Sequence, residues 1–218
     1  MMKIRTNSIQ GYKEKTIPFT LLSKNEGSRS LAIMLPGAGY SVQAPLFHYA
    51  TGLFLNRDID VLQVNYQYND TFYDSFTMEE ITKAITNDVR EVMDQAINTD
   101  DYHTFYLVGK SLGTIAMSSE LKRDVFHSAN AIWLTPLLQR KDVSEAMITC
   151  KNNSICFIGD ADPCYKEDRF KEVKENPVFT TRLISDVDHA LQYRENVLGS
   201  IGVLKNVIDT IEQWVDGI

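Results

Sequence analysis

Short β-rich apolar runs alternate along the chain with longer segments of helical period, and this alternation restricts the fold more than any other feature. Strands are indicated at residues 16–22, 31–35, 61–64, 104–108, 129–134, 154–158 and 180–184. Strands separated by helices are typical of a mostly parallel sheet. The expected fold class is therefore α/β, with a mostly parallel central sheet and helices on both faces.

Hydrophobic periodicity indicates the clearest helix directly after Thr77. The residues Thr77-Met78-Glu79-Glu80 fit a capping box, in which the threonine oxygen accepts a free backbone N–H and a glutamate reaches back. Apolar residues then recur every three or four positions and share one face: Met78, Ile81, Ile85, Val89, Val92 and Ala96. Further helices are expected after residue 45, over 111–121 and over 204–215.

Length and charge limit the class of protein. The chain has 218 residues, with 22 lysines and arginines against 29 aspartates and glutamates, which gives a net charge of −7. No linker or repeat divides the sequence, so one domain over residues 1–218 is expected. The acidic excess argues against nucleic acid as a partner. The longest apolar run, Leu31–Leu35, is far shorter than the ~20 residues that cross a membrane, and no secretory signal is visible. We therefore expect a cytoplasmic protein with no membrane partner.

The three cysteines, Cys150, Cys156 and Cys164, form no Cys-x-x-Cys pair. Their odd number and their spacing indicate neither a disulfide framework nor a zinc site. Reduced thiols are expected, and neither a metal nor a cofactor is predicted.

The segment Gly109-Lys110-Ser111-Leu112-Gly113 matches the pattern Gly-x-Ser-x-Gly between a predicted strand and a predicted helix. A serine at such a turn adopts a strained backbone, and side chains two residues away on either side would collide with neighbouring elements. The turn also places the serine oxygen at the N-terminus of a helix, where negative charge is stabilised. Ser111 is therefore the candidate nucleophile.

A serine hydroxyl needs a base, normally histidine, and the histidine needs a carboxylate to fix its tautomer. Reactive groups of a parallel sheet gather beyond the carboxyl ends of its strands. His103 and His127 precede predicted strands and belong to the opposite rim, while His48 falls on a helix. His189 follows the last strand and is the candidate base.

Two carboxylates, Asp160 and Asp162, follow the predicted strand that ends at Ile158. Asp162 is the preferred partner of His189, because it lies far enough into the loop to reach the neighbouring histidine loop. Asp160 is expected to form a turn, although it stays open as the alternative acid. A metal site built from the two aspartates lacks further ligands nearby.

Acyl transfer also needs donors for an oxyanion, and Pro36-Gly37-Ala38-Gly39-Tyr40 follows a strand where such a loop belongs. The backbone N–H groups of Leu112 and Ala38 are the predicted donors. The alternative is an ordinary strand-to-helix turn. A phosphate-binding loop is disfavoured, because Gly109-Lys110-Ser111 lacks the required glycine at position 104.

With these motifs the chain resembles the α/β-hydrolase superfamily over nearly its whole length, and within it small bacterial esterases and dienelactone-hydrolase-like proteins. Ser111, Asp162 and His189 occur in the family's order of nucleophile, acid and histidine. The segments Gly-Asp-Ala-Asp-Pro and Asp-His-Ala-Leu resemble its acid and histidine loops. Two departures are Pro-Gly where many members have His-Gly, and Lys110 beside the nucleophile. We expect Lys110 to form a surface ion pair or to favour an anionic substrate.

The sequence therefore predicts a serine hydrolase that cleaves a small carboxylic ester or thioester through an acyl-enzyme intermediate. Peptide cleavage and acyl transfer use the same groups, and a catalytically silent binding protein keeps the same fold. These alternatives stay open. The 19 residues from Thr135 to Asn153 leave room for one crossover helix, which predicts an open site without a cap domain and a preference for short esters. The aromatic residues between Tyr66 and Phe76 either wall a substrate pocket or pack a surface loop.

Overall fold

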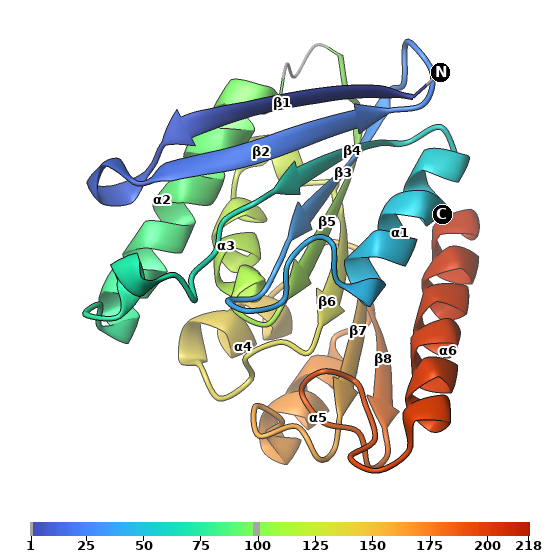
Figure 1. The fold of residues 1–218 in the computed structure, drawn as a ribbon. Coiled ribbons are helices and arrows are strands. Elements are labelled where there is room, and N and C mark those ends of the chain that lie inside the picture. Colours follow the sequence, from blue (N-terminus) through green and yellow to red (C-terminus); the bar gives the residue numbers. More distant parts are fainter. Residues whose placement is uncertain (1, 98–100) are drawn as a thin grey trace.

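A single eight-stranded sheet forms the centre of the computed structural model, which describes residues 2–97 and 101–218 (Figure 1). The strands are β1 (Lys3–Gln10), β2 (Thr16–Ser23), β3 (Ser30–Leu35), β4 (Asp60–Val64), β5 (Thr104–Lys110), β6 (Asn130–Leu134), β7 (Ser154–Gly159) and β8 (Phe179–Ile184). They lie in the order β1-β2-β4-β3-β5-β6-β7-β8. The β1–β2 and β2–β4 pairs are antiparallel and all other pairs are parallel, which confirms the predicted sheet.

Helices cover both faces of the sheet, as predicted. They are α1 (Pro45–Asn56), α2 (Met78–Ala96), α3 (Gly113–Glu120), α4 (Lys141–Ile148), α5 (Glu167–Glu175) and α6 (Val197–Asp216). Figure 1 shows α1 and α6 on one face and α2 to α5 on the other. Each face has its own apolar core, and alternate residues of β3 contribute to the two cores. A strand buried on both faces is apolar at every position, which explains the run at residues 31–35.

The capping box at the start of α2 is present. Glu80 N donates to Thr77 Oγ1 at 3.2 Å, and Thr77 N donates to Glu80 Oε2 at 3.0 Å. Of the predicted apolar stripe, Ile81, Ile85, Val89 and Val92 are buried and Ala96 is half-buried, but Met78 is 54% exposed. The prediction was wrong for Met78 because this residue lies in the first turn, which extends beyond the sheet (Figure 1).

Two elements, β1 and α5, carry no clear signal in the sequence. Only one of the eight residues of β1 is buried, so no alternation of apolar and polar residues marks this edge strand. Its pairing with β2 over the full length supplies the regular structure instead. Helix α5 buries only Phe170 and Val173. Backbone hydrogen bonds and local contacts therefore stabilise both elements, and few buried apolar residues mark them in the sequence.

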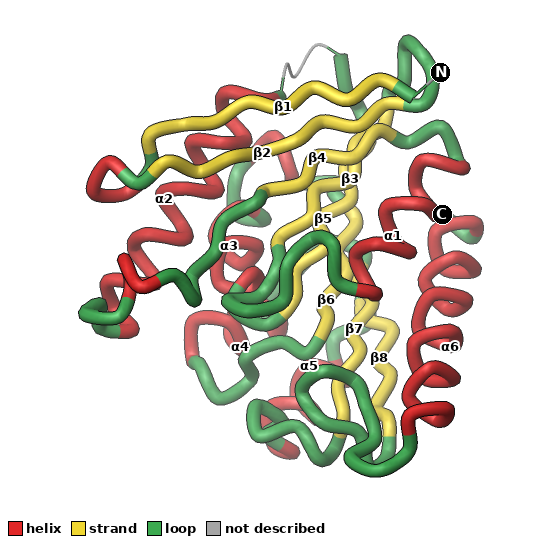
Figure 2. The backbone as a smooth tube through the Cα atoms, viewed as in Figure 1, coloured by secondary structure: helices red, strands yellow, loops and turns green. Residues whose placement is uncertain are grey.

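The connections at the carboxyl ends of the parallel strands lie together at one end of the sheet, as the loops in Figure 2 show. Between β6 and β7 the chain forms the single helix α4 and no further domain, as predicted. No helix among the described residues has the length and apolar character needed to cross a membrane.

Candidate active site

Ser111 lies in the turn between β5 and α3, with a φ of +51° that non-glycine residues rarely adopt. The two flanking glycines allow this turn to pack closely. A Cβ on Gly113 would lie 2.0 Å from the carbonyl oxygen of Leu35, and one on Gly109 would lie 3.0 Å from the sulfur of Met117. These are the two collisions expected from the sequence, one with a neighbouring strand and one with the following helix. The backbone thus presents the Ser111 hydroxyl at the carboxyl end of β5.

His189 lies between Ser111 and Asp162 and contacts both. Its Nε2 is 2.7 Å from Ser111 Oγ, and its Nδ1 is 2.8 Å from Asp162 Oδ2. With Nδ1–H donating to the carboxylate, Nε2 is left to accept the serine proton. The structure therefore brings the three predicted side chains into one hydrogen-bonded chain.

The two candidate carboxylates have different surroundings. The Asp162 side chain is fully buried, and its Oδ1 also accepts a hydrogen bond from Cys164 N at 2.7 Å. Asp160 is exposed and accepts a hydrogen bond from Asp186 N at 2.7 Å. Asp160 therefore joins the acid loop to the histidine loop, as a turn residue does, and Asp162 is the carboxylate that contacts His189.

The sequence matches the alpha/beta hydrolase domain family over residues 28–216. The chain belongs to this family. No curated protein matches it.

Solved structures share the fold of this alpha/beta hydrolase at low sequence identity. A protein of unknown function from Agrobacterium tumefaciens is 18% identical, with a TM-score of 0.69 over 97% of this chain and 95% of that chain. A serine hydrolase homologue from Coxiella burnetii is 11% identical, with a TM-score of 0.68 over 96% of each chain. A serine hydrolase without a lid from Xanthomonas campestris is 16% identical, with a TM-score of 0.63 over 95% of this chain and 94% of that chain. At these identities the likeness shows the fold alone.

The loop after β3 lies against the nucleophile of this alpha/beta hydrolase. A Cβ on Gly37 would lie 3.3 Å from Ser111 Cβ, so the backbone of the loop passes beside the serine. Within the described residues, neither Ala38 N–H nor Leu112 N–H donates a hydrogen bond. Both N–H groups are therefore without a hydrogen-bond acceptor among the described residues, and their role as oxyanion donors stays a prediction.

The aromatic segment after β4 is mainly packed. Tyr66, Tyr68 and Tyr73 are buried, and neighbouring rings meet at centroid distances of 4.4 and 5.1 Å. Tyr66 Oη donates to the carbonyl oxygen of Pro36 at 2.6 Å and so supports the loop after β3. Of the two predicted roles, packing is the one that the contacts show.

The expectation of a surface ion pair at Lys110 was wrong. Lys110 is 1% exposed, and its Nζ donates to His189 O and to Thr135 Oγ1, each at 2.8 Å. Nζ also lies 4.8 Å from the ring centroid of Tyr40. The side chain points inward because the strand position before Ser111 faces the packed interior. Lys110 therefore joins the elbow, which is the turn formed by residues 109–113, to the backbone of the histidine loop.

Burial lowers the pKa of Lys110 to about 8, although the carboxylates of Asp162 and Asp188 act in the opposite direction. Burial also acts to lower the pKa of His189. Hydrogen bonds from its ring to Asp162 and Cys164 outweigh that effect, and the pKa of His189 is raised to about 9. The positive charge of Lys110 opposes this rise. The charges of Lys110, at the end of β5, and of Asp162, after β7, thus act in opposite directions on the pKa of the candidate base.

A second residue missed in the sequence, Asp188, shapes the histidine turn. Its Oδ1 accepts hydrogen bonds from Ala190 N at 2.8 Å and Gln192 N at 3.1 Å. An aspartate that accepts from backbone two residues ahead is a common turn former. The aspartate in Asp188-His189-Ala190 could therefore have indicated a turn from the sequence alone. Nothing in the sequence indicates the contact between Lys110 and the histidine loop.

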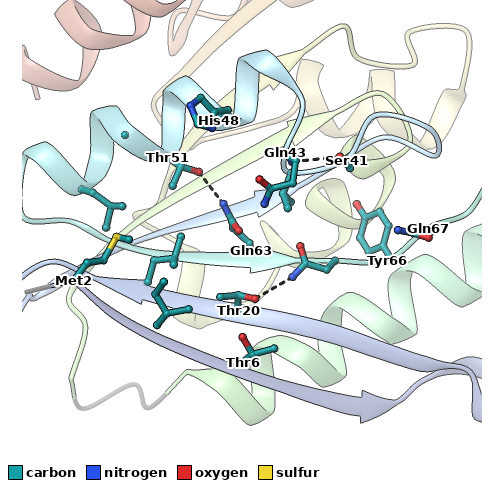
Figure 3. A pocket seen from close by; sticks show the side chains of 16 residues that line it. Met2, Thr6, Thr20, Ser41, Gln43, His48, Thr51, Gln63, Tyr66 and Gln67 are labelled. Atoms are coloured by element: carbon teal, nitrogen blue, oxygen red, sulfur yellow. Dashed lines mark hydrogen bonds between the residues drawn. The ribbon is translucent and has the colours of Figure 1, made fainter.

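A cavity of about 720 Å³ is lined by side chains of β1, β2, α1 and β4 (Figure 3), and Ser111, Asp162 and His189 are not among its lining residues. The cavity lies between α1 and the strands β2 and β4. Beside it, Gln63 Nε2 donates to Thr51 Oγ1 at 3.0 Å and joins β4 to α1. His48 lines it from the exposed side of α1. Since Ser111, Asp162 and His189 do not line this cavity, the candidate active site is defined by their hydrogen bonds.

A smaller groove of about 280 Å³ lies next to the histidine loop. Ala190, which follows His189, lines it together with apolar side chains of α1 and α6. These side chains are Pro45, Leu46, Val197, Ile201 and Leu204. Polar side chains, among them Gln192, Arg194 and Ser200, also line the groove, so its surface is mixed.

Proposed function

We propose that this alpha/beta hydrolase is a serine esterase that cleaves small carboxylic esters. The observation that carries the proposal is the pair of contacts of His189, at 2.7 Å to Ser111 Oγ and 2.8 Å to Asp162 Oδ2. Nucleophile, base and orienting carboxylate within hydrogen-bond reach are what acyl transfer requires.

In the proposed mechanism, neutral His189 accepts the proton of Ser111 while Oγ attacks the ester carbonyl carbon. The N–H groups of Leu112 and Ala38 donate to the resulting oxyanion, each contributing about 3 kcal/mol to transition-state stabilisation. Asp162 stabilises the imidazolium, which then protonates the leaving alcohol. Water activated by His189 hydrolyses the acyl-serine and regenerates the enzyme. The mechanism uses no metal and no cofactor.

Small substrates fit the site better than long acyl chains. The groove beside Ala190 offers about 280 Å³, and no cap covers it among the described residues. An acyl chain that extends beyond such a groove stays in water and loses the ~0.8 kcal/mol that each buried CH₂ contributes. Acetyl to butyryl esters are therefore the proposed substrate class. Thioesters use the same chemistry.

The proposal is tested by hydrolysis of p-nitrophenyl acetate with the wild-type enzyme and with Ser111→Ala. Wild-type protein should turn over the ester, and Ser111→Ala should lose activity by about 10⁶ in kcat while keeping its thermal transition. Equal rates for the two proteins would contradict the proposal. A series of esters from acetyl to dodecanoyl tests the substrate class, with kcat/KM expected to stop rising beyond butyryl.

A further inference from the structure

Cys164 is a reactive side chain at the candidate active site that the proposed mechanism does not use. One ligand atom from each of Asp162, Cys164 and His189 lies within 4.8 Å of the other two. The Cys164 thiol is half-buried, and Gln139 Nε2 lies 3.2 Å from its sulfur. A thiol, an imidazole and a buried carboxylate therefore converge on one small volume.

This combination of ligands matches the preferences of the zinc ion. Thiolate, imidazole and carboxylate all bind Zn²⁺, and three protein ligands with one open position are a common arrangement. We propose, resting on the serine esterase function, that Asp162, Cys164 and His189 bind Zn²⁺ and that the bound ion switches the hydrolase off.

The local geometry already holds one ligand in place. Cys164 N–H donates to Asp162 Oδ1, which fixes the carboxylate and leaves Oδ2 for the ion. Ligand atoms around a tetrahedral zinc ion lie roughly 3 to 4 Å apart, given metal–ligand bonds of about 2.0 to 2.3 Å. Asp162 Oδ2 and His189 Nδ1 lie 2.8 Å apart and need only separate slightly, while the thiol closes on them.

Zinc on either ring nitrogen of His189 removes the base. An ion on Nδ1 leaves the remaining ring proton on Nε2, which then cannot accept the proton of Ser111. An ion on Nε2 occupies the lone pair directly and displaces Ser111 Oγ. The Cys164 thiol releases its proton to solvent as the sulfur–zinc bond forms, and nothing is oxidised or reduced.

This site is not apparent from sequence spacing, because its ligands come from two loops. Asp162 and Cys164 follow β7, whereas His189 follows β8. Spacing rules for zinc sites rely on ligand pairs that are close in the sequence, and only the fold brings this set together.

Zinc inhibition and zinc binding are measured separately. The concentration of ZnCl₂ that halves p-nitrophenyl acetate hydrolysis is compared for wild type, Cys164→Ser and Cys164→Ala, with each rate normalised to that of the metal-free protein. Cys150→Ser is the matched control, because Cys150 is also half-buried and belongs to no such ligand group among the described residues. Calorimetric titration of Ser111→Ala with ZnCl₂ reports binding without relying on activity.

We expect EDTA-reversible inhibition of wild type and Cys150→Ser, a half-inhibition concentration at least about tenfold higher for both Cys164 variants, and no effect of Mg²⁺. Ser111→Ala should bind one zinc ion, and the double variant Ser111→Ala/Cys164→Ala should bind it at least about tenfold more weakly. Equal zinc sensitivity with and without the Cys164 thiol, or no difference in calorimetric affinity, would overturn the proposal. Zinc binding by a protein that hydrolyses no ester would contradict the esterase function and leave the metal site supported.

Discussion

Ser111 and His189 meet in one hydrogen bond but are positioned in different ways. Ser111 is held by its backbone, in a tight turn whose flanking glycines contact β3 and α3. His189 lies on a loop after the edge strand β8 and is held by side chains from elsewhere in the chain, chiefly Asp162 after β7 and Lys110 at the end of β5. The nucleophile thus depends on steric fit, and the base depends on a hydrogen-bond network.

The two mechanisms of positioning respond to mutation differently. A steric site fails when volume is added, since the neighbouring backbone has nowhere to move. A hydrogen-bonded site fails when one partner is removed, since the remaining buried groups lose their interactions. A substitution on one side of the candidate site should therefore disturb that side and leave the other in place.

The largest effect is expected on the histidine side, from Asp162→Asn. This change removes the charge that fixes the His189 tautomer, and kcat should fall by about 10⁴. Asp160→Asn is the matched control, because Asp160 contacts only Asp186 N on the neighbouring loop, and it should cost less than about tenfold. Steady-state kinetics with p-nitrophenyl acetate measures both. The opposite ranking would identify Asp160 as the acid.

The pH profile should show the raised pKa of His189. An imidazolium cannot accept the proton of Ser111, so activity requires the neutral ring, which predominates above a pKa of about 9. Between pH 7 and 9, kcat/KM should rise by about 50-fold, in proportion to the neutral fraction of the ring. In Asp162→Asn the hydrogen bond that raises the pKa is lost, and the rise should shift to lower pH. A flat wild-type profile over this range would contradict the geometry.

Lys110→Met should disturb the base and leave the elbow in place. The substitution removes the donor to His189 O and Thr135 Oγ1, so the histidine loop loses a fixed contact. We expect kcat to fall between about tenfold and 100-fold, with little change in KM. Lys174→Met, on the exposed side of α5, is the control and should change neither quantity.

The smallest expected effect is steric and lies on the nucleophile side. Gly113→Ala places a Cβ 2.0 Å from a backbone oxygen, and the free energy of unfolding should fall by about 1–3 kcal/mol. Gly109→Ala meets the flexible end of Met117 at 3.0 Å and should cost less. Urea denaturation compares the two variants. Equal losses would contradict the expected difference in steric fit between the two glycines.

The difference between the two sides also explains what the sequence could predict. The elbow is encoded within five consecutive residues, and the order of Ser111, Asp162 and His189 follows from the order of the strands. The α/β sheet follows from apolar patterning because its central strands are buried on both faces. These features are local or periodic, and the sequence displays them directly.

The remaining features depend on contacts between distant residues. Lys110 is separated by 79 positions from His189, whose carbonyl oxygen accepts its hydrogen bond. Without the fold, the sequence indicates only a charged side chain beside the nucleophile, and a charged side chain is expected on the surface. Strand β1 is polar at most positions and is specified by pairing with β2 rather than by burial. The choice between Asp160 and Asp162 likewise required knowing which carboxylate contacts the imidazole.

Covalent labelling tests the central claim most directly, because a fluorophosphonate reacts only with a serine that has a functioning base. Mass spectrometry of the labelled and digested protein should place one adduct per chain on Ser111, and Ser111→Ala should take up no label. Asp162→Asn should react far more slowly than wild type. An unlabelled wild-type protein, or an adduct on a residue other than Ser111, would contradict the account.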